Sequence, residues 1–130
     1  MHKRFLIIAS LLSCLAVILG AFGAHGLKAI VPVESLSSFE TGVRYHIFHG
    51  FALAIAGFAS QRFSFKWTRY AGYFFITGII LFSGSLYALT LMKATDTVGL
   101  NGIGIITPIG GLFFIAGWLA LARAFSLKNA

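Results

Sequence analysis

The chain has 130 residues, of which 58% are hydrophobic and 10% are charged, whereas in a soluble domain about half are apolar and about a quarter charged. Together with a mean hydropathy of +0.92, this composition excludes an ordinary soluble domain. The formal net charge of +7 does not indicate a nucleic-acid partner, because the basic residues lie at the ends of apolar blocks and are not interleaved with exposed aromatic residues. We therefore expect residues 1–130 to form a single membrane domain in contact with the lipid bilayer.

The first apolar block runs from Phe5 to Ala24, directly after Lys3 and Arg4. As a helix its twenty residues would be about 30 Å long, which matches the hydrocarbon thickness of a bilayer. A cleaved signal peptide is the alternative, because the block has a basic start and small residues near its end. Its apolar core, however, is longer than the usual length of about 7 to 15 residues. We predict a first membrane span over about 5–24.

A polar connection follows, and the second apolar block has only sixteen residues, from Tyr45 to Ser60. We predict a second span over about 43–60. Ser37 and Glu40 have the spacing of a capping box, which predicts that this helix starts near Ser37, before it enters the membrane.

The last two blocks predict spans over about 70–92 and about 102–122. Pro108 lies near the start of the fourth block, where two interpretations are open. Either Thr107 caps a helix that begins at Pro108, or the helix begins near Asn101 and kinks at the proline. We favour the kink, because the segment before Pro108 would otherwise be non-helical at membrane depth. The predicted fold class is all-α, an integral membrane four-helix bundle.

Basic residues are distributed unequally between the two sides of this predicted bundle. Seven lie on one side and three on the other, so the positive-inside rule predicts that both the N- and C-termini are cytoplasmic. The seven are Lys3, Arg4, Arg62, Lys66, Arg69, Arg123 and Lys128, and the three are Lys28, Arg44 and Lys93.

Five residues near the predicted outer face are candidates for one polar cluster: His25, His46, His49, Tyr87 and Thr107. Imidazoles bind copper, zinc or iron and titrate near neutral pH, so a metal or proton site is one hypothesis. The alternative is a set of neutral histidines that hydrogen-bond between helices. We favour this alternative because no carboxylate lies inside any predicted span. We therefore expect no bound metal and no other cofactor.

Sequence signatures of soluble enzymes are missing. The chain has no phosphate-binding loop, and Gly102-Ile103-Gly104 lacks the third glycine and the preceding strand of a dinucleotide fingerprint. We therefore expect a protein that is not an enzyme and has no catalytic residues.

Small residues recur on one face of each predicted span, which favours close packing between helices. This pattern predicts a structural or assembly component that associates with itself or with another membrane protein. A small transport or ion-pathway subunit is the alternative, because Pro108 interrupts the glycine-rich stretch from Gly99 to Gly111. A metal-binding membrane protein that uses the outer histidines is a third hypothesis. In the first span the small residues are Ala9, Ser13, Ala16, Gly20 and Gly23.

Five short motifs occur along nearly the whole chain and together resemble the YgdD family of small bacterial inner-membrane proteins. The resemblance implies a four-span protein of the bacterial inner (plasma) membrane and adds no biochemical mechanism. His25, His49, Tyr87 and Thr107 lie within the motifs, whereas His46 lies outside them. The motifs are Gly20-Ala-Phe-Gly-Ala-His-Gly26, Phe48-His49, Leu81-Phe-Ser-Gly-Ser-Leu-Tyr87, Thr107-Pro-Ile-Gly-Gly111 and Ala116-Gly-Trp118.

Overall fold

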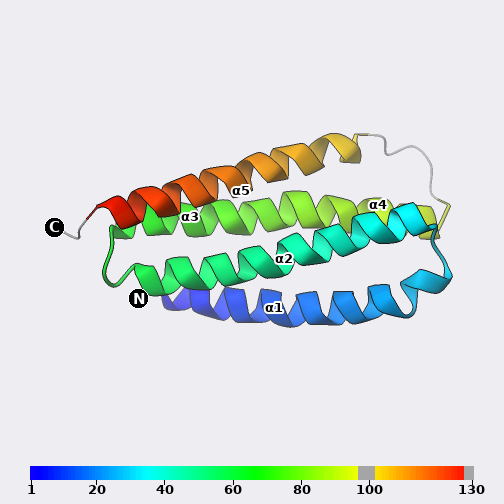
Figure 1. The fold of residues 1–130 in the computed structure, drawn as a ribbon, viewed down its shortest axis with the longest axis horizontal. Coiled ribbons are helices and arrows are strands. Elements are labelled where there is room, and N and C mark those ends of the chain that lie inside the picture. The colour runs from blue at the N-terminus through cyan, green and yellow to red at the C-terminus, as the bar shows by residue number, and fades with distance from the viewer. Residues whose placement is uncertain (97–101, 128–130) are drawn as a thin grey trace.

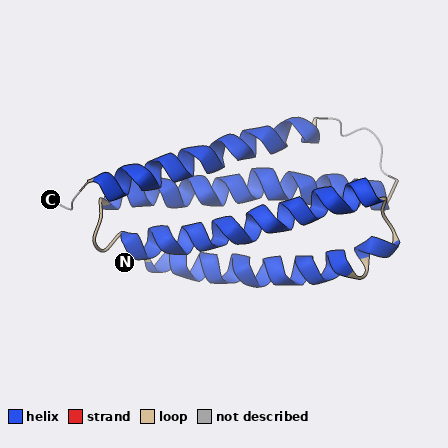
Figure 2. Ribbon diagram, viewed as in Figure 1, coloured by secondary structure: helices blue, strands red, loops and turns tan. Residues whose placement is uncertain are grey.

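The computed structural model describes residues 1–96 and 102–127, and within them the regular structure is entirely helical. The helices form four long rods that run alternately up and down, side by side (Figure 1, Figure 2). The predicted all-α membrane bundle is therefore confirmed. The elements are α1 (Lys3–Ala24), η1 (Leu27–Ala29), α2 (Val33–Ala59), α3 (Phe65–Gly78), η2 (Ile79–Ser83), α4 (Gly84–Ala94) and α5 (Ile103–Ser126).

The helix α2 begins one turn earlier than the capping-box spacing predicts. Pro32 precedes Val33 in an extended conformation, with φ −62° and ψ 157°, and the helix starts directly after it. Proline has no backbone N–H and a fixed φ, so it suits the residue that leads into a helix. Ser37 and Glu40 therefore lie inside α2, and the predicted start near Ser37 is wrong.

The third rod is a continuous helix from Phe65 to Ala94, in which α3 and α4 are joined by the π-helical turn η2. A π turn closes its hydrogen bonds over five residues instead of four and accommodates one extra residue. The sequence gives no sign of this turn, because the apolar pattern continues through it.

Pro108 lies inside α5, which begins at Ile103. The helix is therefore formed on both sides of the proline, as the favoured interpretation predicts, and Thr107 is not its cap. Because Pro108 has no backbone N–H, the Gly104 carbonyl lacks its α-helical partner at this turn.

The helices α2 and α3 form the middle of the bundle, with α1 packed on one side and α5 on the other. Aromatic rings fit into notches left by glycines on the facing helix. The Phe5 ring of α1 lies against Gly72 of α3, and the Phe75 ring of α3 lies against Gly117 of α5, where an added Cβ would come within 2.6 Å of it. These glycines allow the close approach that the small-residue pattern predicts.

Three helical segments are long and apolar enough to cross a membrane: Lys3–Ala29, Phe65–Ala94 and Ile103–Ser126. The remaining long helix, α2, has 27 residues. It does not meet the same criterion of length and apolar composition, and it carries Arg44 and two buried histidines. Polar residues in membrane bundles normally face the interior, which fits the middle position of α2. Each predicted span falls on one of these four rods.

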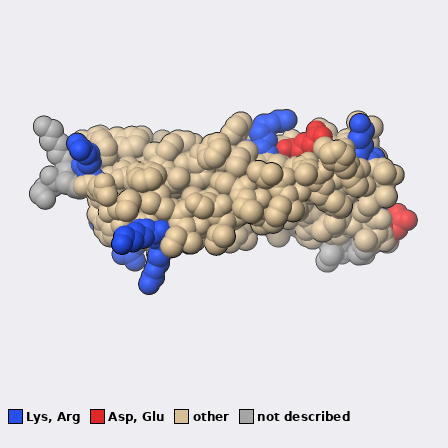
Figure 3. Space-filling model, turned by 90° about the horizontal axis from the view of Figure 1, so that it is seen from below, with Lys and Arg blue, Asp and Glu red and all other residues tan. Residues whose placement is uncertain are grey.

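Charged side chains are divided between the two ends of the bundle. The end where α1 and α3 begin carries basic side chains without acidic neighbours, and the acidic side chains on the face in Figure 3 lie toward the other end. The chain's three acidic residues are Glu34, Glu40 and Asp96.

Candidate functional site

The five residues of the predicted polar cluster lie in three separate contacts and one isolated position. His46 contacts Tyr87, Thr107 contacts Ser85, and His49 contacts Trp118. His25 lies apart from all three.

The contact between α2 and α4 is made by His46 and Tyr87. His46 is 1% exposed, and its Nδ1 atom shares a hydrogen bond of 2.8 Å with the Tyr87 hydroxyl. The Ser83 hydroxyl donates to the Gly42 carbonyl at 2.7 Å, so the π turn η2 supplies a second link to α2.

The other ring nitrogen of His46 has no hydrogen-bond partner among the described residues, although it is buried. The Leu12 carbonyl of α1 lies near the ring but does not reach hydrogen-bond geometry. An unpaired polar atom in the interior costs roughly 1 to 3 kcal/mol. His46 is therefore a linking residue whose hydrogen-bonding capacity is only half used.

His49 joins α2 to α5, and its tautomer follows from its two partners. The indole N–H of Trp118 donates to Nε2 at 3.1 Å. Tryptophan can only donate, so Nε2 carries no proton. The proton lies on Nδ1, which donates to the Tyr45 carbonyl at 2.6 Å. The ring also stacks on Phe114, with ring centroids 3.6 Å apart.

Sequence reasoning did not identify Trp118 as the partner of His49. The residue lies in the motif Ala116-Gly-Trp118, so a signal was present. The motif does not show which residue this side chain faces. Trp118 is half exposed, and its ring contacts Phe75 as well as His49.

Thr107 and Ser85 join α5 to α4. The Ser85 hydroxyl donates to the Phe82 carbonyl at 2.9 Å, so its single hydrogen is already used. The Thr107 hydroxyl, 2.5 Å away, must then be the donor to Ser85 Oγ. This contact lies immediately before Pro108.

His25 is exposed, and its Nδ1 atom bonds only the Ala21 carbonyl one turn back, at 2.9 Å. The structure therefore does not bring His25 to His49. Within residues 1–96 and 102–127, no three His, Cys, Asp or Glu side chains lie close enough together to hold a metal ion. The three contacts tie α2, α4 and α5 together.

A lateral groove of about 440 Å³ lies beside these contacts, between α2 and α5. We call it the α2–α5 groove. Aromatic and aliphatic side chains form most of its wall, and the His49 nitrogens in the wall are already paired. Its lining consists of Tyr45, His49, Phe82, Pro108, Gly111, Leu112, Phe114, Ile115 and Trp118.

Comparison with known proteins places the chain among bacterial membrane proteins. The family model described as "Protein of unknown function (DUF423)" matches residues 19–111. The UPF0382 membrane protein YwdK of Bacillus subtilis is 39% identical over 123 residues, which cover 94% of this chain and 95% of YwdK.

Two further relatives show a similar match. A UPF0382 membrane protein of Staphylococcus aureus is 43% identical over 94% of both chains. The UPF0382 inner membrane protein YgdD of Escherichia coli is 38% identical over 99% of this chain and 95% of its own. No solved structure matches. The resemblance to the YgdD family is thereby confirmed, and the chain belongs to the DUF423 family of membrane proteins.

Proposed function

We propose that this membrane protein is a non-enzymatic structural or assembly component that receives a transmembrane helix of a partner in its α2–α5 groove. The partner is a second copy of the chain or another membrane protein. The observation that carries the proposal is the pair of glycines on the groove side of α5 that no internal helix uses.

Gly104 and Gly111 are seven residues apart and therefore lie on the same face of α5. A Cβ at Gly104 would meet nothing within 4 Å, and a Cβ at Gly111 would meet only the Phe82 ring at 3.9 Å. Several other glycines of the bundle have close internal neighbours, such as Gly117 against Phe75 and Gly78 against Phe114. Small residues let a second helix approach closely in a membrane, whereas a lipid chain does not require them. This difference favours a helix as the occupant.

The paired polar side chains favour a structural role over the alternative of a transport or ion-pathway subunit. An ion pathway needs polar groups that follow one another across the bilayer and are free to bind the ion. His49, Thr107 and Ser85 instead donate to or accept from groups of the protein itself.

The proposed orientation has both termini in the cytoplasm, with the chain crossing the bacterial inner membrane four times. The distribution of basic residues supports it, and the name of the E. coli relative includes the inner membrane.

Site-specific photo-crosslinking in native membranes tests the assembly proposal. A photoreactive phenylalanine analogue replaces Leu112 in the groove or, as a matched control, Leu11 on the outer side of α1. Both leucines are 65% exposed, so lipid reaches both equally. We expect a discrete adduct of higher mass from position 112 only, and its mass identifies a second copy or another protein.

A second variant distinguishes helix docking from random collision. Gly111→Leu adds a large side chain on the groove side of α5, where an added Cβ would meet only the Phe82 ring at 3.9 Å, so it should abolish the adduct while the helical content stays unchanged. Equal labelling at positions 11 and 112, or an adduct that survives Gly111→Leu, would contradict the proposal.

A further inference from the structure

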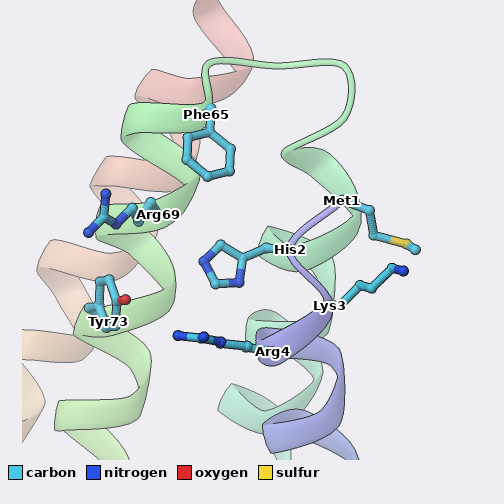
Figure 4. A pocket seen from close by; sticks show the side chains of 7 residues that line it. All are labelled: Met1, His2, Lys3, Arg4, Phe65, Arg69 and Tyr73. Atoms are coloured by element: carbon cyan, nitrogen blue, oxygen red, sulfur yellow. The ribbon is translucent and has the colours of Figure 1, made fainter.

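A basic cavity of about 450 Å³ opens at the end of the bundle where α1 and α3 begin (Figure 4). It lies away from the α2–α5 groove and is independent of the function proposed above. Its walls come from the first turns of two neighbouring helices. The residues that matter to its chemistry are His2, Lys3, Arg4, Phe65, Arg69 and Tyr73.

Two arginine side chains, one from each helix, line this cavity. Figure 4 shows the His2 ring and the Arg4 side chain projecting from α1 toward α3, while Lys3 turns to the other side. Arg69 of α3 lies over the ring of Tyr73, with its Cζ atom 5.7 Å from the ring centroid. Arg4 and Arg69 therefore bring two positive charges to one concave site.

The helix ends add to this positive field. The first turns of α1 and α3 contain no acidic residue, and no side chain caps either helix. The free N–H groups and the dipole at a helix N-terminus favour an anion. The chain's acidic side chains, on α2 and after α4, do not line the cavity.

His2 is held in place beside these charges. Its backbone N–H donates to the Gly57 carbonyl at 3.1 Å, and its ring stacks on Phe5 with centroids 3.7 Å apart. The Nδ1 atom of the ring is buried without a hydrogen-bond partner among the described residues. The stacked ring of His2 therefore forms a fixed part of the cavity wall.

We propose that this cavity binds the phosphate group of an anionic phospholipid. Arginine matches phosphate geometry because its planar guanidinium donates two parallel hydrogen bonds. A lipid headgroup is favoured over free phosphate, because the cavity opens between two candidate spanning helices, at the end of the bundle where both of them begin. The exposed rings of Phe65 and Tyr73 are placed to contact the glycerol and the first acyl carbons.

The test measures phosphatidylglycerol retained by the full-length protein in detergent, using native mass spectrometry and titration. The test variant is Arg4→Gln/Arg69→Gln. The control is Arg62→Gln/Lys66→Gln, which removes two charges at the same end but outside the cavity. All four side chains are exposed, so both variants should fold, and circular dichroism checks this. We expect affinity to fall about thirtyfold in the test variant only.

Two further measurements separate the sources of phosphate. Inorganic phosphate added to the protein in phosphatidylcholine nanodiscs should not compete, and phosphatidylglycerol in the nanodisc should bind. Equal losses in the test and control variants would show a diffuse surface attraction and overturn the proposal. Binding of inorganic phosphate as tight as that of the lipid would overturn the choice of a lipid, and unchanged affinity in the test variant would overturn the site itself.

Discussion

Individual polar residues in this bundle connect particular pairs of helices. His49 illustrates this, since each of its ring nitrogens has one defined partner, the Tyr45 carbonyl or the Trp118 indole. The neutral ring therefore has a fixed tautomer and a fixed orientation against Phe114. Such a residue affects stability through the partner that its removal would leave unpaired.

Replacing His49 should separate the hydrogen-bonding role of the ring from its volume. His49→Gln should keep most of the stability, because an amide retains both a donor and an acceptor. His49→Leu should reduce the free energy of unfolding by about 1 to 2 kcal/mol, because the Trp118 N–H loses its acceptor. Thermal unfolding in detergent measures both. His25→Leu is the control and should have a smaller effect, and equal losses in the two leucine variants would contradict the linking role of His49.

His2 should make stability depend on pH. Burial of the ring, together with the charges of Arg69 and Arg4, lowers the pKa of His2 below its ordinary value of 6.5. The unfolded chain then takes up a proton more readily than the folded protein does. The contribution of the neutral His2 ring to stability is therefore full above pH 6.5 and is lost as the pH falls toward the lowered pKa.

Thermal unfolding of the wild type and of His2→Gln checks whether acidification lowers stability through His2. The measurements are made at about pH 7.5 and about pH 5, which lie on either side of the ordinary histidine pKa. The wild type should lose more stability on acidification than the variant, since all other titrating groups are common to both proteins. An identical pH dependence in the two proteins would show that His2 does not contribute.

At the scale of helices, the sequence predicted the features that depend on the length and composition of its apolar blocks. The existence of four helices and the helical surroundings of Pro108 follow from apolar run length and from the cost of irregular backbone in lipid. The hydrogen-bond partners of the polar residues could not be predicted from the apolar blocks. They depend on how each helix is rotated about its axis, and the π turn at Ile79–Ser83 changes that rotation without changing the apolar pattern. The separation of His25 from His49 was likewise not predictable from spacing.

The two adjacent glycines of α5 should respond differently to a single added methyl group. A Cβ at Gly110 would run into the backbone of Phe82, which cannot move aside, whereas a Cβ at Gly111 has room. Gly110→Ala should therefore destabilise by about 1 to 3 kcal/mol through overpacking. Gly111→Ala should be neutral or slightly stabilising, because alanine favours the helix. Unfolding temperatures in the same detergent compare the pair, and equal effects would mean that α5 does not pack through Gly110.

For the whole molecule, the asymmetry of charge is the feature that predicts its orientation in the membrane. The end at which α1 and α3 begin carries Lys3, Arg4, Lys66 and Arg69, and the basic residues of this end outnumber those of the other. Reporter fusions at Asn129 and within 35–38 should therefore report opposite sides of the membrane, with Asn129 in the cytoplasm. Reporters on the same side would require an even number of crossings between residues 38 and 129, so that one of the last three predicted spans does not cross the membrane.

The π turn in the third rod also determines which mutations the chain can absorb. One residue of an α-helix corresponds to a rotation of about 100°, so the extra residue in Ile79–Ser83 sets the facing direction of everything that follows in α4. Regular α-helix over the same number of residues would swing Tyr87 away from His46 and Ser85 away from Thr107. Deleting one residue there would instead remove the residue that the turn absorbs, so the shortened segment could form regular α-helix and leave the facing direction of α4 unchanged. The rod should therefore tolerate the loss of one residue within Ile79–Ser83, and the length of this segment is as much a determinant of the fold as its composition.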